Sequence, residues 1–136
     1  MPTTFFQPAK MLKKSANACV FCWPQMGARS RLFPSFVAVV FSPAGYSWNL
    51  SPPLRERLLT AMKNIAMPVM IIHAQNDYSV NPGYALDSMM NQLHKTHVLK
   101  IYPKFGNSAS DGHGLIYQGT KIWEADVFKF LNEHLE

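Results

Sequence analysis

An aspartate and a histidine, Asp77 and His113, each follow a short apolar segment that has the character of a β-strand. Asp77 comes shortly after the apolar run 69–72, and His113 lies between two glycines in a loop after residues 98–102. Because parallel strands end at one edge of a sheet, these two side chains can meet there. A carboxylate that orients an imidazole is the base half of a nucleophilic triad. We therefore expect Asp77 and His113 to form an acid–histidine pair at the carboxyl edge of a sheet.

The elements that must position this pair alternate along the chain. Unbroken or alternating apolar runs predict strands, and apolar residues at helical spacing predict helices between them. Ser51 followed by two prolines is typical of a helix N-terminus. Strands alternating with helices indicate right-handed crossovers and a parallel sheet. We expect a three-layer α/β fold with a short parallel sheet of about three strands and flanking helices: strands over 36–41, 69–73 and 98–102, and helices over about 52–65, 82–94 and 121–135.

The N-terminal residues have a less regular pattern. Several prolines interrupt residues 1–33. Within them, Leu12, Ala16, Cys19 and Trp23 are spaced for one face of a short helix over 12–23. We therefore divide the chain into an N-terminal segment, 1–33, and a single α/β domain, 34–136.

The domain resembles the C-terminal half of an α/β-hydrolase, and is closest to the dienelactone-hydrolase-like group. The resemblance rests on the order of four stretches: FVAVVFSPAG, HAQNDYSVNP, KIYPKFG with the following DGHGL, and the closing helix that begins at Trp123. It implies that Asp77 is the triad acid and His113 the triad base, in the family's order of nucleophile, acid and histidine. It also implies activity on carboxylic ester or lactone bonds. Residues 1–33 would then be a remnant of the helix at the nucleophile elbow.

The nucleophile is the element in which the chain departs from this family. The family places its serine in a G-x-S-x-G elbow, and this chain has no such motif. Ser15 lies at the expected distance, with Lys13 and Asn17 in place of the glycines, whereas Ser30 lies in the wrong position. The resemblance therefore predicts a truncated hydrolase in which Ser15, Asp77 and His113 form the triad. The alternative is a catalytically inactive remnant that acts as a binding or interaction protein.

Charge and hydropathy exclude several other classes of protein. The 136 residues carry a formal charge of +5, but the basic residues form no dense block and no nucleic-acid motif accompanies them. No apolar run approaches the ~20 residues that span a bilayer. The first residues do not have the order of a secretory signal. We expect a small-molecule ester or lactone substrate, no nucleic-acid or membrane partner, and self-association through an exposed sheet edge.

Two cysteines, Cys19 and Cys22, form a CxxC motif that could be a redox pair or half of a zinc site. His94 and His97 could supply the other half, but they span the predicted end of a helix and the start of a strand. Cysteines buried as small apolar residues are more frequent than such sites. We therefore expect no metal and no cofactor, and a metal-binding module remains the alternative from a different class.

Overall fold

The computed structural model describes residues 18–24, 36–43 and 45–134. These residues form a mixed α/β fold, as the alternating pattern predicts. None of the helices in these ranges is long and apolar enough to cross a membrane. In chain order the elements are β1 (Ala18–Pro24), β2 (Phe36–Pro43), α1 (Gly45–Leu50), α2 (Pro52–Asn64), β3 (Val69–Ala74), α3 (Asn81–Gln92), β4 (His97–Tyr102), α4 (Ala109–His113), α5 (Leu115–Gln118) and α6 (Thr120–Glu133).

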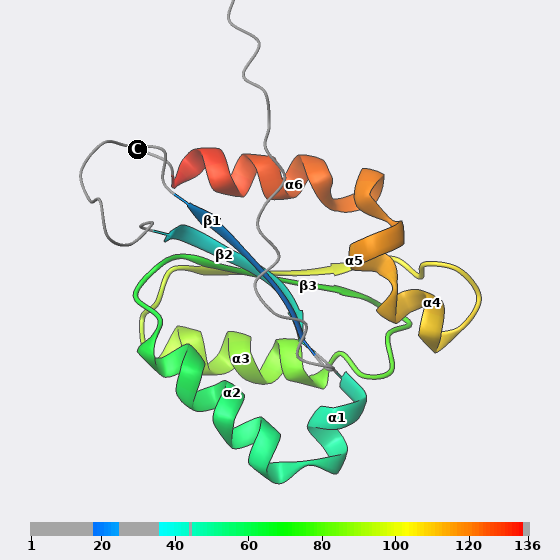
Figure 1. Ribbon diagram of the computed structural model, residues 1–136, viewed down its shortest axis with the longest axis horizontal. Coiled ribbons are helices and arrows are strands. Elements are labelled where there is room, and N and C mark those ends of the chain that lie inside the picture. Colours follow the sequence, from blue (N-terminus) through cyan, green and yellow to red (C-terminus); the bar gives the residue numbers. More distant parts are fainter. Residues whose placement is uncertain (1–17, 25–35, 44, 135–136) are drawn as a thin grey trace, which may run out of the picture.

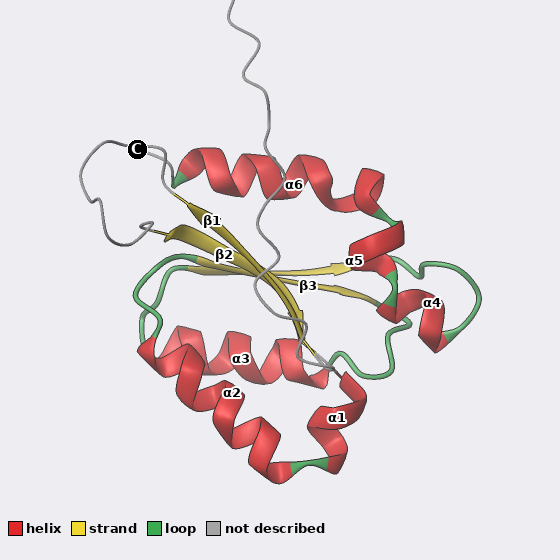
Figure 2. Ribbon diagram, in the orientation of Figure 1, coloured by secondary structure: helices red, strands yellow, loops and turns green. Residues whose placement is uncertain are grey.

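The four strands form one sheet in the order β1-β2-β3-β4. β2 pairs in parallel with β3, and β3 in parallel with β4, in a register that joins Val69 to His97 and Ala74 to Tyr102. Helices α1, α2 and α3 lie on one side of the sheet, whereas α5 and α6 lie on the other (Figures 1 and 2). β3 therefore lies between two strands and two layers of helices.

The prediction of a helix over 12–23 is wrong for the part that the structure describes. Residues 18–24 form β1, which runs antiparallel to β2 from Ala18 opposite Pro43 to Cys22 opposite Val39. This segment contains valine, phenylalanine and tryptophan, which favour strands when a pairing edge is available. The predicted helical spacing could not detect that edge. As a result, the described residues form a sheet of four strands instead of about three, and β1 pairs along the edge of β2.

β3 provides the core on both faces of the sheet. All six of its residues are buried. Met70, Ile72 and Ala74 pack into the core with α5 and α6, while Val69 and Ile71 pack with α2 and α3. Successive side chains of a strand point to opposite faces, so His73 belongs to the same face as Val69 and Ile71. A polar ring thus occupies a position on the α3 face where the strand otherwise carries apolar side chains.

The helices start and end close to the predicted positions. Ser51 caps α2 by accepting a hydrogen bond from the backbone N–H of Leu54, and two prolines follow it as expected. α3 and α6 also match their predicted ranges to within a few residues. The expected loop around His113, after residues 98–102, is wrong in part, because this segment contains the short helices α4 and α5.

Candidate acid–histidine site

Asp77 lies in the turn directly after β3, at the carboxyl end of the strand. Its backbone N–H donates to the carbonyl of Ala74, which closes the turn. Only 1% of its side chain is exposed. The backbone N–H of Tyr78 donates to Oδ1 over 2.7 Å. The turn therefore buries a carboxylate in a fixed orientation.

His113 is the last residue of α4, a helix that the sequence analysis missed. Ser108 caps this helix by accepting from the N–H of Asp111, and Asp111 Oδ2 accepts from the backbone N–H groups of Asn107 and Ser108. This reciprocal capping box satisfies donors that would otherwise be orphaned at the helix start. The spacing of Ser108 and Asp111 is typical of a helix start, but the nearby glycines favoured the prediction of a loop. The histidine is thus presented by a short capped helix.

Asn76 joins the turn after β3 to the segment after β4. Its amide nitrogen donates to the carbonyl oxygens of Phe105 and Ser108, each over 2.8 Å. Its amide oxygen accepts from the N–H of Phe105, also over 2.8 Å. Gly112 packs directly on the same turn, since a Cβ atom there would lie 2.6 Å from the carbonyl carbon of Asn76. Together these contacts hold the end of α4 against the turn that carries Asp77.

The structure places Asp77 and His113 side by side, as their positions after two strands predict. Asp77 Oδ1 and His113 Nδ1 are 3.0 Å apart. The imidazole is 40% exposed, while the carboxylate is buried. The Tyr78 ring lies beside the His113 imidazole, with 5.5 Å between the ring centroids and an angle of 55° between the ring planes. Because Nδ1 donates to the carboxylate, Nε2 of the neutral ring carries the free electron pair and can accept a proton.

The electrostatics of the pair suit a base that becomes charged. Burial raises the pKa of Asp77, but hydrogen bonds from His113 and His73 outweigh it and hold the pKa below its usual value of 3.8. The hydrogen bond to Asp77 raises the pKa of His113 above its usual 6.5, against the opposing effect of desolvation. The carboxylate therefore stays ionised near neutral pH and stabilises the imidazolium form of His113.

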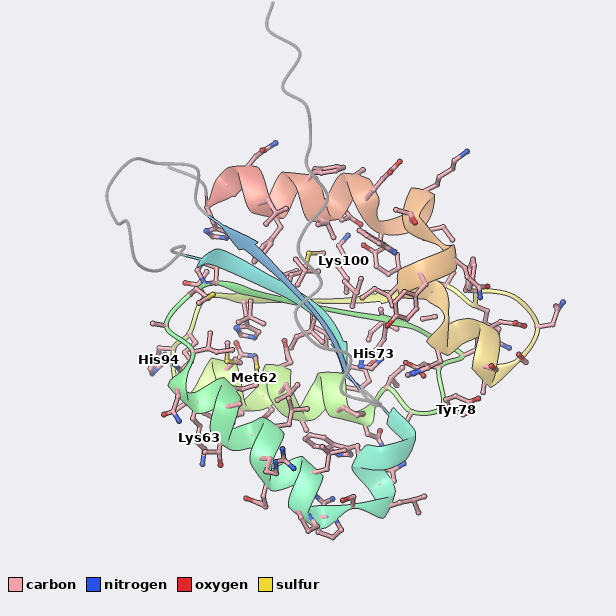
Figure 3. All side chains as sticks on the ribbon, in the orientation of Figure 1. Met62, Lys63, His73, Tyr78, His94 and Lys100 are labelled. Carbon is pink, nitrogen blue, oxygen red and sulfur yellow. The ribbon has the colours of Figure 1, made fainter. Side chains whose placement is uncertain are left out.

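A second histidine contacts the other oxygen of the same carboxylate. His73 Nδ1 lies 3.0 Å from Asp77 Oδ2, and the His73 side chain is fully buried. Figure 3 shows His73 inside the molecule, near the end of the structure where Tyr78 lies. The sequence pattern predicts His73 only as a residue of the strand over 69–73. The signal available was a histidine four residues before the acid, in a strand otherwise made of apolar residues.

The other candidate residues are placed differently. Ser15 lies outside the described residues, so the structure does not test it as the nucleophile. Cys19 and Cys22 belong to β1, and only their backbone is described. His97 contacts the carbonyl of Lys95 through Nδ1 and Asp87 Oδ1 through Nε2, over 2.7 and 3.1 Å. The part of the chain that the structure describes contains no group of three or more residues able to hold a metal ion.

Comparisons with known proteins do not identify a relative. No family model matches the chain, and neither the curated proteins nor the solved structures contain a match. The resemblance to α/β-hydrolases therefore stays a prediction from the residues. What the structure provides is a mixed α/β fold with a histidine–aspartate–histidine cluster at the carboxyl ends of its parallel strands.

Proposed function

We propose that this chain is a hydrolase of carboxylic ester or lactone bonds that uses Asp77 and His113 as the acid and base of a catalytic triad. The observation that carries the proposal is the 3.0 Å contact between a buried carboxylate and a partly exposed imidazole. This contact leaves Nε2 as the basic nitrogen, which is the arrangement that a general base requires. The substrate class follows from the resemblance to dienelactone-hydrolase-like enzymes.

In this mechanism the nucleophile is the hydroxyl of Ser15, by the family's chain order. His113 Nε2 takes the proton of the hydroxyl as its oxygen attacks the carbonyl carbon of the substrate. The same proton then passes from His113 to the leaving alkoxide, and an acyl-enzyme remains on the serine. Water attacks this ester with His113 again acting as the base, which releases the carboxylic acid and restores the serine. Asp77 stabilises the imidazolium that forms in both halves of the reaction.

Covalent labelling tests the nucleophile and the Asp77–His113 dyad together. An alkyl fluorophosphonate phosphonylates a serine that a neighbouring base activates, as the serine oxygen displaces fluoride from phosphorus. We expect one adduct per chain by intact-mass spectrometry, on Ser15 by peptide mapping. The adduct should be absent from Ser15→Ala and retained in Ser30→Ala, a matched control that removes another serine of the N-terminal segment. Absence of an adduct on the wild-type chain, or an adduct that persists in Ser15→Ala, would overturn the assignment of the nucleophile.

A further inference from the structure

The second histidine on Asp77 has no place in the triad mechanism, yet the structure gives it a specific contact. We propose that His73 is a positioning residue: it binds Asp77 Oδ2 from the buried side and thereby keeps Oδ1 directed at His113. The catalytic meaning of this role rests on the proposed function. The contact itself is a property of the folded chain and can be tested without activity.

The burial of His73 indicates that its ring contacts neither solvent nor substrate. The side chain is fully buried, and Nε2 has no hydrogen-bond partner among the described residues. Gly83 of α3 closes that edge of the ring, because a Cβ atom there would lie 2.7 Å from Cδ2 and 3.0 Å from Nε2. A buried nitrogen without a partner costs free energy that a leucine on this face would not cost. The contact that offsets this cost is the one to Asp77.

The geometry also fixes which ring nitrogen carries the proton. A proton on Nε2 would be a buried donor facing Gly83 without an acceptor, whereas a proton on Nδ1 points at Asp77 Oδ2, 3.0 Å away. A His73 ring with a single proton therefore carries it on Nδ1 and donates it to the carboxylate. The two oxygens of Asp77 are thus assigned to different partners: Oδ1 to Tyr78 N–H and His113, and Oδ2 to His73.

This division of partners restrains rotation of the carboxylate. Without His73, Oδ2 would lose a donor in a buried site, and the group could turn to bring either oxygen toward His113 or toward a water molecule. A misplacement of about 1 Å in a catalytic group can cost about 10² in rate. His73 therefore acts on the reaction through Asp77, at a distance from any substrate.

Two substitutions at position 73 separate hydrogen bonding from packing. In His73→Asn the amide nitrogen lies near the position of Nδ1, so the donor is retained. In His73→Leu an apolar side chain fills the space without a donor. For ester hydrolysis we expect His73→Leu to lower kcat about 10²-fold with little change in KM, and His73→Asn to stay within about fivefold of the wild type.

A second readout does not depend on activity. In ¹H–¹⁵N spectra of the folded chain, the Nδ1–H proton of His113 should be protected and strongly deshielded because of its bond to Asp77. We expect this resonance to persist in His73→Asn and to broaden or move upfield in His73→Leu. The matched control is His97→Leu, which removes a histidine that contacts a different aspartate, Asp87, and should leave both readouts unchanged.

The outcomes distinguish this role from the proposed function. A wild-type chain without esterase activity contradicts the proposed function, while a His113 resonance that is lost in His73→Leu and kept in His73→Asn still supports the positioning role. An unchanged resonance in His73→Leu, or equal losses in both variants, would overturn it. If His73→Leu fails to fold, His73→Gln takes its place. Its amide nitrogen falls near Nε2, so it should lose the resonance that His73→Asn keeps, and retention in His73→Gln would overturn the role.

Discussion

His113→Ala is expected to lower kcat/KM for hydrolysis of p-nitrophenyl acetate by about 10⁴-fold or more, because the substitution removes the imidazole that we propose as the general base. In the structure, His113 is the partly exposed partner of a buried carboxylate, and alanine leaves no group that could accept the serine proton. The loss should appear in kcat more than in KM, since the imidazole acts in the transition state and not in ground-state binding. Initial rates over a range of ester concentrations measure both constants.

The control for this experiment must account for imidazole chemistry, because any exposed histidine hydrolyses activated esters slowly. His94→Asn is the matched control: His94 is exposed and has a positive φ of 52°, a conformation that asparagine tolerates. Figure 3 shows His94 at the opposite end of the molecule from Tyr78, the neighbour of His113. We expect His94→Asn to keep the wild-type rate. A His113→Ala variant as active as His94→Asn would remove His113 from the mechanism.

Asp77→Asn should give the second largest effect, a loss of about 10⁴ in kcat with the fold retained. Asparagine fits the space of the carboxylate, but its amide can donate to His113 Nδ1 and so favours the tautomer with the proton on Nε2. That tautomer cannot take a proton from the nucleophile through Nε2. The imidazolium would also lose the negative charge that raises the pKa of His113. Steady-state kinetics, together with a thermal unfolding curve to verify folding, measure this effect.

Asp87→Asn provides the comparison for the loss of one carboxylate. Asp87 contacts His97 over 3.1 Å, so the variant removes a carboxylate from a His–Asp contact that does not involve Asp77, between α3 and the start of β4. We expect its kcat to match that of the wild type. Equal losses in Asp77→Asn and Asp87→Asn would show that the rate responds to general destabilisation, and would contradict a specific role for Asp77.

The sequence was sufficient to place Asp77 and His113 together for a simple physical reason. Parallel strands end at a common edge, and both residues follow strands that the apolar pattern identified. The segments that follow the two strands both lie at that edge, so the two side chains could be expected to meet there.

Two of the features that the sequence did not reveal, β1 and the role of His73, depend on tertiary contacts, and a third, α4, is a very short helix. β1 is a strand because the edge of β2 is available for pairing, which local helical spacing cannot represent. α4 is short, so it has no hydrophobic periodicity, and only its capping box marks it. The role of His73 depends on which face of β3 it occupies and on Gly83, which lies ten residues further along the chain. For β1 and His73, the residues that determine the structure are distant in sequence. For α4, the helix is too short to show a periodic pattern.

The pH titration of His113 in the folded chain, followed by ¹H–¹⁵N NMR, tests the central claim most directly, because it examines the dyad without any assumption about the nucleophile. The pKa of His113 is raised by Asp77, so the imidazolium should persist above pH 6.5 and lose its proton only as the pH rises through the raised value. Above that pH we expect the Nδ1–H tautomer, with Nε2 unprotonated, and in Asp77→Asn a midpoint that falls. A wild-type midpoint at or below 6.5, or a neutral ring protonated on Nε2, would contradict the account.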